Sequence, residues 1–475
     1  RYISVTGVQT CALPICVDDV TAHPAFRAGA QTIAGLYDLK ADPAKRDLFS
    51  FEENGERFSR YFLQCRTRED LRSKMACHKA LAEATYGLIG RTPDHVGGLL
   101  TGLSMKPSVM EDLHPGFGRN LTRYYEHVRR NDLYLCFAVV PPTGLRHQQI
   151  FPGQERDDPS LQVIAEDDNG VTLSGMKMLA TGGVYADEVW IGNLTPIDDK
   201  FPQQSITCAL PLNAPGVTLW SREPYARSVR HEADYPLSAR FDETDCVLVC
   251  DRVKVPWERV FLHNNGTMSR RIYTDTASNC YANHQSNVRF WAKMGLLTGL
   301  ASRLCQANGI DRLPPVRELL GRFAALEATI GGMVCGQVEA CESWPEGYVT
   351  PNRRFMYAAL NWCQEHHTEI IDIVRQLVGG LPMQMPASID ILQDPALRDR
   401  FERWWKTPSI DALPRLKLYK LAWDLVGSEF AGRHQLYEKF YAGNSIVVRN
   451  QNDREAPWER FHGIVDGLLA RIPDA

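Results

Sequence analysis

Residues 161–175 read LQVIAEDDNGVTLSG, two short runs of β-forming residues on either side of a turn rich in Asp, Asn and Gly. Short runs of this kind, bounded by turn residues, are typical of β-strands. Further runs occur at residues 188–191, 205–208, 217–220, 246–249 and 253–255. Many short strands at close spacing predict an antiparallel β barrel or sandwich, which we assign to a domain of residues 134–270.

The chain changes character on both sides of this β region. Residues 74–88 (KMACHKALAEATYGL) are rich in helix formers, and residues 17–133 are predicted to form a helical domain. Long periodic segments at residues 285–307, 315–341, 354–378 and 413–431 predict a helical bundle over residues 271–475. The predicted fold class is therefore α+β, with a helical domain, a β domain and a helical bundle in that order.

The first 16 residues (RYISVTGVQTCALPIC) have neither a helical nor a strand period, and they do not begin with Met. They resemble translated sequencing-adapter sequence, so residues 1–16 are interpreted as a non-native segment and carry no functional argument. A short signal peptide is the alternative, although the segment lacks a basic stretch followed by a sustained apolar core.

Composition gives a second set of expectations. The 475 residues are 44% hydrophobic and 23% charged, which are ordinary values for a globular protein and exclude global disorder. A formal net charge of −4 gives no electrostatic reason to expect nucleic acid or a membrane surface as a partner. No apolar run approaches the roughly 20 residues of a membrane-spanning helix. The 13 cysteines form no CxxC pair, which favours reduced thiols and predicts a cytoplasmic protein.

Several common chemical motifs are absent from the sequence. It has no GxGxxG, no phosphate-binding loop of the GxxxxGK type, no HExxH and no GxSxG. The adjacent residues His366 and His367 would point in two directions on a helix, so no metal site is predicted. Cys246 and Cys250 share one face of a predicted strand and are interpreted as buried packing thiols.

Six stretches that follow one another along the chain carry a family signature. They are residues 17–27 (VDDVTAHPAFR), 90–94 (GRTPD), 174–181 (SGMKMLAT), 235–245 (YPLSARFDETD), 251–258 (DRVKVPWE) and 427–438 (GSEFAGRHQLYE). Together they resemble the flavin-dependent 4-hydroxyphenylacetate 3-hydroxylase family, the large oxygenase component of two-component monooxygenases. The resemblance implies an acyl-CoA-dehydrogenase-like fold in a homotetramer or homodimer.

The same resemblance implies the chemistry. Such an enzyme hydroxylates a phenol ortho to its hydroxyl group through a flavin hydroperoxide, with dioxygen as co-substrate. Reduced FAD is supplied by a separate NAD(P)H-dependent flavin reductase, which would explain why the chain needs no nicotinamide motif. A dry pocket is required, because water would release hydrogen peroxide instead.

Position by position, the resemblance also implies site residues. Arg91 matches the arginine that favours the phenolate, and Thr181 matches the threonine beside the reactive nitrogen of the flavin. The implied substrate contacts are Arg91, Thr92, Pro93, Asp94, His95, Phe137, Asn193 and Leu194. The implied FAD contacts are Phe137, Ala138, Val139, Val140, Thr143, Arg146, Thr181, Tyr441, Ala442, Gly443 and Asn444. From the residues alone, Arg91 and Arg146 could equally be surface residues of loops, and Thr181 could simply end a strand.

Three positions depart from the pattern of a 4-hydroxyphenylacetate hydroxylase. His95 stands in place of Tyr, Phe137 in place of a His that contacts the phenol oxygen, and Pro141 in place of Asn. Such changes should alter the preferred substrate, so a tyrosine-like amino acid, a halophenol, a secondary-metabolite phenol and 4-hydroxyphenylacetate all stay open. His95 could restore a donor or act as a base, and His284 lies where halophenol-oxidising relatives place a base; a structural role is the alternative for both.

Rival functions are an FAD-dependent acyl-CoA dehydratase or dehydrogenase of the same fold and a flavin-binding subunit that has lost activity. The dehydratase needs cysteine ligands for an iron–sulfur cluster. No cysteine lies between Cys77 and Cys136, and Trp291 occupies the position of the downstream ligand. Retention of Arg91 and Thr181 argues against the inactive subunit.

Overall fold

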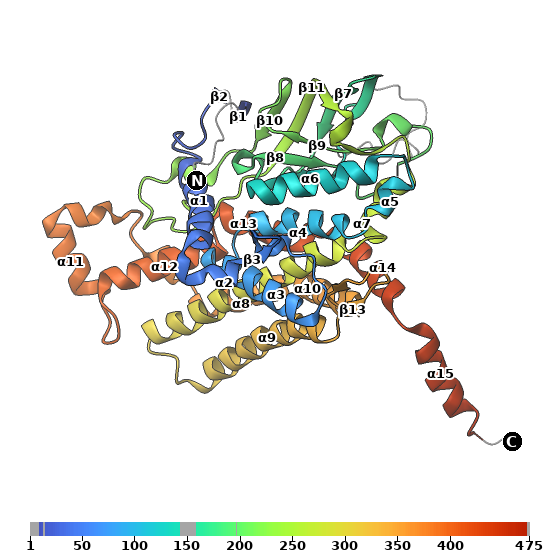
Figure 1. Cartoon of the computed structure of the whole chain (residues 1–475). Coiled ribbons are helices and arrows are strands. Elements are labelled where there is room, and N and C mark those ends of the chain that lie inside the picture. Colours follow the sequence, from blue (N-terminus) through green and yellow to red (C-terminus); the bar gives the residue numbers. More distant parts are fainter. Residues whose placement is uncertain (1–8, 13–14, 143–157, 196, 473–475) are drawn as a thin grey trace, which may run out of the picture.

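The computed structural model describes residues 9–12, 15–142, 158–195 and 197–472. Figure 1 shows the β-sheets on one side of the molecule, the N-terminal helices beneath them and the long C-terminal helices on the opposite side. The α+β fold class is confirmed. The predicted boundaries near residues 133 and 270 stay predictions, although the elements change from helix to strand before Leu135 and back to helix at Met268.

The N-terminal part is mainly helical, and one of its helices, α3, begins at a capping box. The Thr67 side chain accepts from the backbone N–H of Asp70, whose carboxylate accepts from the N–H of Thr67, and this capping box starts α3. In α4, every residue is buried. The elements are α1 (Arg27–Ala41), α2 (Arg46–Phe49), α3 (Arg68–Ala84), α4 (Pro93–Ser104), α5 (Ser108–Glu111) and α6 (Phe117–Asn131), with a hairpin of β3 (Ser50–Glu53) and β4 (Glu56–Ser59).

The central strands form two sheets within the described residues, one of six strands in the order β2-β1-β10-β11-β7-β6 and one of four in the order β12-β9-β8-β5. The neighbours are antiparallel except for the parallel pairs β1/β10 and β5/β8. The strands are β1 (Gln9–Ala12), β2 (Ile15–Val17), β5 (Leu135–Ala138), β6 (Gln162–Asp167), β7 (Gly170–Lys177), β8 (Glu188–Ile191), β9 (Ile206–Pro211), β10 (Val217–Ser221), β11 (Cys246–Pro256) and β12 (Val260–His263).

The opening segment, whose sequence has no strand period, nevertheless forms β1 and β2 within its described residues. β1 pairs in parallel with β10, and β2 folds back on β1. The pairing arises from backbone hydrogen bonds to the edge of the sheet, which an edge strand can accept without an alternating side-chain pattern.

The C-terminal part is a helical bundle, confirming the predicted type. Its elements are α7 (Met268–Thr274), α8 (Ser278–Ala307), α9 (Pro314–Glu339), α10 (Arg353–Val378), α11 (Pro395–Trp405), α12 (Ala412–Val426), α13 (Glu429–Phe440), α14 (Ser445–Glu455) and α15 (Trp458–Leu469), with a small hairpin of β13 (Glu342–Ser343) and β14 (Val349–Thr350). The helix expected at residues 413–431 is two helices, because Ser428 caps α13 by accepting from the N–H of Ala431.

A buried ion cluster joins α8 to α13. Arg289 donates to both carboxylate oxygens of Glu438 at 2.6 and 2.7 Å, and Lys293 donates to the same group at 2.9 Å. All three side chains are almost fully buried. Both buried cations are therefore paired with Glu438. Because these pairs hold only in one geometry, they fix the position of α13 on the bundle.

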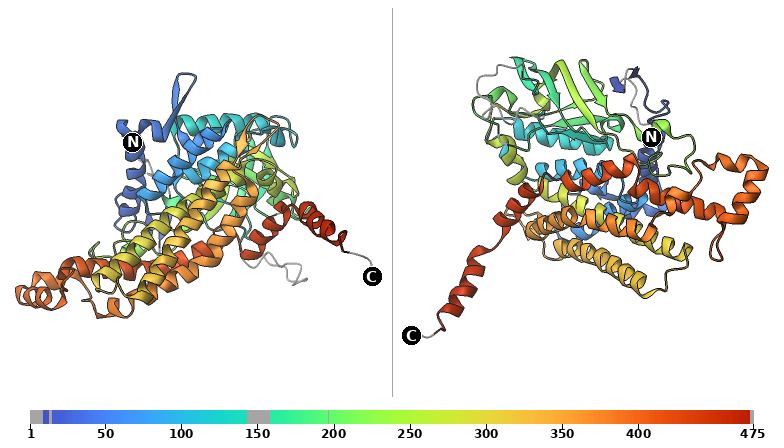
Figure 2. Two further views of the ribbon diagram at one scale, coloured as in Figure 1. Left: turned by 90° about the horizontal axis from the view of Figure 1, so that it is seen from below. Right: turned by 180° about the vertical axis from the view of Figure 1, so that it is seen from behind.

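Helix α9 corrects the expectation that the chain holds no apolar segment of membrane-spanning length. In the described part of the chain, α9 is long and apolar enough to cross a membrane by length and composition, and 22% of its most apolar window is buried. Its Leu, Ile, Val, Phe, Met, Cys and Ala residues raise the mean hydropathy, while Gly, Arg322 and Glu327 between them prevent an unbroken apolar run. Helix α15 is a second exposed element, and both views of Figure 2 show it projecting from the body.

Candidate active site

The loop before α4 places Arg91 by its backbone. The N–H groups of Gly90 and Arg91 both donate to one carboxylate oxygen of Glu243, each at 2.9 Å. Gly90 has to be glycine here, because a Cβ at this position would overlap the hydroxyl of Tyr437. Thr92 and Pro93 then begin α4, and the fixed φ of proline suits the first helical position.

The Arg91 guanidinium lies among three aromatic rings. Its central carbon is 5.0 Å from the ring centre of Phe137, 5.7 Å from that of Tyr437 and 6.0 Å from that of Tyr441. One terminal nitrogen donates to the backbone oxygen of Tyr441 at 3.0 Å, and the other contacts Nε2 of His95. Aromatic faces attract a cation electrostatically, so these rings hold the guanidinium in place, and no carboxylate of the described residues pairs with it.

Burial keeps His95 neutral, and the contact with Arg91 decides which ring nitrogen carries the proton. Burial, and then the charge of Arg91, lower the pKa of His95 well below its usual value, so the ring is neutral. A guanidinium can only donate hydrogen bonds, and Nε2 of His95 must therefore be the acceptor nitrogen. The proton is thereby assigned to Nδ1, which is buried and has no partner among the described residues.

Residues of all three parts of the chain line a cavity of about 120 Å³ beside Arg91. Arg91, His95 and Leu99 come from α4 and the loop before it, Phe137 from β5 and Leu194 from the loop after β8. The C-terminal bundle contributes Arg270, Tyr273, Asn279, Ala282, Asn283, Tyr357, Leu360, Tyr441, Ala442, Val447, Val448 and Gln451. The enclosure needs the packing of all three parts.

A second buried network joins Thr181 to the same scaffold. The Thr181 hydroxyl donates to Asp245 at 2.8 Å, and Arg433 of α13 donates to both oxygens of Asp245 at 2.9 and 2.7 Å. Arg433 also donates to Glu243 at 2.6 Å. Burial alone would raise the pKa of Asp245, but the guanidinium of Arg433 holds it below its usual range. Asp245 is therefore ionised and accepts the hydrogen bond that the Thr181 hydroxyl donates.

The remaining residues of the GRTPD loop point into the protein interior instead. Asp94 accepts from the Thr92 hydroxyl and lies 2.6 Å from Nδ1 of His78, while Gln285 donates to Thr92 at 3.1 Å. Pro93 is buried in the first turn of α4. These side chains build the support of the loop rather than the wall of the cavity.

The predicted contacts Asn193 and Leu194 separate in the structure. Leu194 lines the cavity, whereas the Asn193 side chain is buried between Lys177 and two backbone oxygens. Its amide oxygen accepts from Lys177 and its nitrogen donates to Gln204 and Ile206. The Asn193 side chain is therefore committed to the protein, and the residue does not line the cavity.

His284 is not brought to the cavity within the described residues. Its Nδ1 lies 2.7 Å from Oε1 of Gln337, and its ring centre lies 6.4 Å from that of His78. Burial lowers the pKa of His284 to about 3. On α8 the cavity is lined by Asn279, Ala282 and Asn283, a helical face to which His284 does not belong.

The predicted FAD contacts fall into two described groups. Ala138 and Val139 are buried behind Phe137, and Val140 accepts from the N–H of Met178 at 2.8 Å. Tyr441 and Ala442 line the cavity, Gly443 has φ +95°, and Asn444 caps α14 by accepting from the N–H of Val447. Thr143 and Arg146 lie outside the described residues.

The residues present fit a flavin. Burial leaves the hydroxyl of Tyr441 without a partner in the described chain, as a polar ligand would require. Aromatic faces line one wall, and a helix N-terminus, which suits phosphate, follows Asn444. Among the described residues, no group of three or more His, Cys, Asp or Glu side chains is placed to hold a metal ion.

Sequence reasoning missed the residues that hold the site together. Glu243, Asp245, Arg433 and Tyr437 all lie inside quoted stretches, residues 235–245 and 427–438, yet none received a role. Their one signal in the sequence was the single arginine, Arg433, in one quoted stretch and the acidic group at residues 242–245 in the other. Which acid meets which base depends on the tertiary packing of α13 against the β domain.

Comparison with known proteins gives one consistent result. The family model described as 4-hydroxyphenylacetate 3-hydroxylase N terminal matches residues 16–262, and the corresponding C-terminal model matches residues 269–470. The 4-hydroxyphenylacetate 3-monooxygenase oxygenase component of Thermus thermophilus is 30% identical, over 95% of this chain and 93% of that protein. A Streptomyces globisporus monooxygenase of a carrier-protein-bound 3-amino-3-(3-chloro-4-hydroxyphenyl)propanoyl group is 30% identical, over 91% and 82%.

Solved structures agree. An oxygenase component of 4-hydroxyphenylacetate 3-monooxygenase, crystallised with FAD and 4-hydroxyphenylacetate, has a TM-score of 0.92 and 26% identity, covering 99% of this chain and 97% of that one. An archaeal 4-hydroxybutyryl-CoA dehydratase has a TM-score of 0.88 at 18% identity, covering 99% and 94%, and shows the shared fold alone.

The position of Glu243 gives a direct test of the scaffold. In Glu243→Gln, the amide nitrogen has to face a donor, either Arg433 or the two N–H groups of the Arg91 loop. We expect the free energy of unfolding to fall by about 3–5 kcal/mol, as for other broken buried ion pairs. Urea denaturation measures the change. Glu223→Gln, which removes a surface partner of Arg227, is the control and should change stability by less than about 1 kcal/mol. Equal stability of the two variants would contradict the proposed role of Glu243 in joining the Arg91 loop to Arg433.

Proposed function

The chain belongs to the 4-hydroxyphenylacetate 3-hydroxylase family, and from this premise we propose that it is the oxygenase component of a two-component flavin-dependent monooxygenase. Its reaction would add one oxygen atom to the ring of a phenol, ortho to the hydroxyl group. Bound reduced FAD would supply the electrons for the reaction with dioxygen. The observation that carries the proposal is the Arg91 guanidinium, which lies beside a cavity lined by all three parts of the chain and has no carboxylate partner among the described residues.

Arg91 and His95 would act together on the phenol oxygen. A phenol ionises near pH 10 in water, and a fixed cation beside its oxygen favours the anion at neutral pH. The Nδ1–H of neutral His95 would add a second donor to the same oxygen. The phenolate is more electron-rich at its ortho carbon, which is where oxygen is added. In this protonation state His95 serves as a donor and not as a base.

Thr181 would face the cofactor as an acceptor. Its proton is committed to Asp245, so only oxygen lone pairs remain available to a ligand. Such an oxygen can accept from an N–H group of a reduced flavin, but it cannot donate to a carbonyl group of the flavin. Phe137 to Val140 on one side and Tyr441 to Asn444 on the other are the proposed cradle of FAD. The reductase that delivers it is proposed to be a separate protein, since this chain carries no nicotinamide motif.

The acceptor is proposed to be a 4-substituted phenol. The relatives described above act on 4-hydroxyphenylacetate and on a larger carrier-bound phenol. His95 replaces one polar side chain by another, whereas Phe137, whose ring centre lies 5.5 Å from that of His95, replaces a polar side chain of the family pattern by an apolar ring. A site with fewer such groups should discriminate less by the substrate's hydroxyl and more by its remaining substituents.

The alternative functions have weaker support. The dehydratase shares the fold, but the sequence offers no cysteine between Cys77 and Cys136 for an iron–sulfur cluster. An inactive flavin-binding subunit would not need to keep Arg91 buried and, among the described residues, without a carboxylate partner. A buried charge of this kind destabilises a protein unless it serves a ligand.

We further propose that the protein is a homo-oligomer of the cytoplasm. The outward residues of α9 (Gly321, Ala325, Ala328, Gly332 and Cys335) are small, exposed and spaced alternately by four and three. No other atom lies within 4 Å of a Cβ built at Gly321 or Gly332. This spacing is typical of a seam between two helices, and a second copy would cover it. Apolar side chains exposed on α15, among them Ile464 and Leu468, offer a further contact.

Arg91→Gln tests the proposed function. Gln cannot supply a charge to the phenol oxygen, so we expect hydroxylation to fall about 100- to 1,000-fold while reduced FAD binds with nearly unchanged affinity. Product is measured by mass spectrometry for one added oxygen, with a generic flavin reductase. The matched control is Arg227→Gln, which removes a surface guanidinium paired with Glu223. Hydroxylation near the wild-type rate in Arg91→Gln would refute the role of this residue.

Ala328→Arg tests the oligomer. A charged side chain in the centre of the α9 seam should prevent close helix packing, so light scattering after gel filtration should report a smaller mass than for the wild type. Ala41→Arg, at the exposed end of α1, should keep the wild-type mass. A wild-type protein that is already monomeric, or an Ala328→Arg variant of unchanged mass, would contradict the proposal.

A further inference from the structure

A second hollow, of about 470 Å³, opens beside the Arg91 cavity and has a basic wall. It is lined by four arginines, Arg270, Arg271, Arg353 and Arg454, and by two carboxylates, Asp275 and Glu455. The chain as a whole has a formal net charge of −4, so a hollow with two surplus positive charges is a local exception. Its volume is in the range of small-molecule sites.

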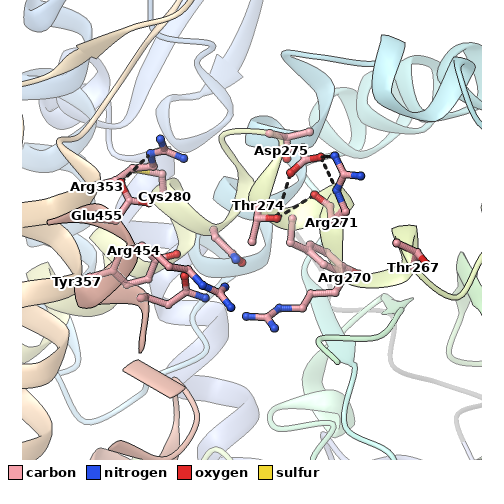
Figure 3. A pocket seen from close by; sticks show the side chains of 14 residues that line it. Thr267, Arg270, Arg271, Thr274, Asp275, Cys280, Arg353, Tyr357, Arg454 and Glu455 are labelled. Carbon is pink, nitrogen blue, oxygen red and sulfur yellow. Dashed lines mark hydrogen bonds and ion pairs between the residues drawn. The ribbon is translucent and has the colours of Figure 1, made fainter. Parts of the chain in front are cut away.

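Both carboxylates of the wall are committed to other arginines. Asp275 accepts from Arg271 at 2.7 and 3.0 Å. Glu455 lies 3.7 Å from Arg353, which also pairs with Glu342 at 3.3 Å. Figure 3 shows these pairs at the edges of the hollow. Neither carboxylate is therefore available to neutralise a further arginine of the hollow.

The other two arginines face the hollow without a counter-charge. Within the described residues, Arg270 and Arg454 have neither a carboxylate within 4.0 Å nor a side-chain hydrogen bond. Figure 3 shows their guanidinium groups pointing toward one another across the hollow. Two like charges directed into one space repel each other, and an anion between them would turn the repulsion into attraction.

The hollow is continuous with the candidate active site. Five residues, Arg270, Tyr273, Asn279, Tyr357 and Gln451, line both the hollow and the Arg91 cavity. Arg270 therefore stands at the junction, with its charge available from either side. A molecule that places a ring beside Arg91 can extend a side arm along these residues into the hollow.

Resting on the function proposed above, we propose that Arg270 and Arg454 bind the anionic end of the phenolic substrate, a carboxylate or a phosphate group on the side arm of the ring. Paired guanidinium groups match the planar geometry of carboxylate and phosphate oxygens. The amide side chains of Asn279 and Gln451 lie along the path and can hydrogen-bond the arm. The preferred acceptor is thus an acidic phenol, in which one arginine fixes the ring and two fix the far end.

The location separates this site from the proposed FAD cradle. Arg454 lies ten residues after Asn444 on α14, which is about 15 Å along a helix. The N-terminus of that helix, and not its far end, belongs to the cradle. The diphosphate of FAD is nevertheless an anion, so the experiment has to distinguish the two sources.

The test compares three phenols that differ in charge: 3-(4-hydroxyphenyl)propanoate, neutral 4-propylphenol and cationic tyramine. Dissociation constants are measured by calorimetry on the full-length protein without cofactor, and hydroxylation is followed separately with reduced FAD. The variants are Arg270→Gln and Arg454→Gln. The control is Arg449→Gln. Arg449 lies on α14, as Arg454 does, and pairs with Glu365 at the surface.

We expect the wild type to bind the propanoate more tightly than 4-propylphenol, and each variant to weaken the propanoate about tenfold or more. Binding of 4-propylphenol should stay unchanged in all proteins, and Arg449→Gln should behave as the wild type. Equal affinity of the wild type for the anionic and neutral phenols would overturn the proposal. So would variants that weaken FAD relative to riboflavin while leaving the propanoate unaffected, because the anion would then be the cofactor's diphosphate.

The two proposals fail separately. Charge-dependent binding without any hydroxylated product would retain the anion site and contradict the monooxygenase. Hydroxylation without charge preference would retain the monooxygenase and contradict the anion site.

Discussion

The buried carboxylate of Glu243 is the interaction on which the candidate site depends. One of its oxygens accepts from the backbone of Gly90 and Arg91, and the other accepts from Arg433. The β domain thereby fixes the N-terminal loop and the C-terminal bundle through a single group. Because the three parts of the chain wall one cavity, a shift of this carboxylate would move the Arg91 side chain and the opposite wall together. Arg433 extends the same constraint to Asp245.

Burial explains why this scaffold is polar and yet rigid. An unpaired charge in the interior is expensive, so each buried group has to hold its partners in one geometry. Arg91 is the exception, since its neighbours are aromatic rings, a backbone oxygen and a neutral His95. The network around Glu243 and Asp245 neutralises Arg433, whereas the charge of Arg91 is kept available to a ligand. Such a preorganised cation needs no rearrangement when a ligand anion forms beside it.

Much of this arrangement could be predicted from the sequence. The strand runs and helical periods gave the α+β class, and the GRTPD stretch placed Arg91 and His95 four residues apart, so that both face one side at the start of α4. The partners of Glu243 could not be predicted, because its contacts cross from residue 243 to residues 90 and 433 and leave no local pattern. His284 shows the same limit: the family resemblance implied a base at this position, but the side chain lies against Gln337 of α9 instead.

The central claim is that Arg91 holds an ionised phenol, and 4-nitrophenol measures this directly because only its anion absorbs strongly in the visible range. The absorbance of the bound ligand is titrated with pH in the protein without cofactor, for the wild type and for Arg91→Gln. The account predicts a pKa of bound nitrophenol below that of the free compound in the wild type, and loss of this shift in the variant. A bound nitrophenol whose pKa is unchanged or raised in the wild type would contradict it.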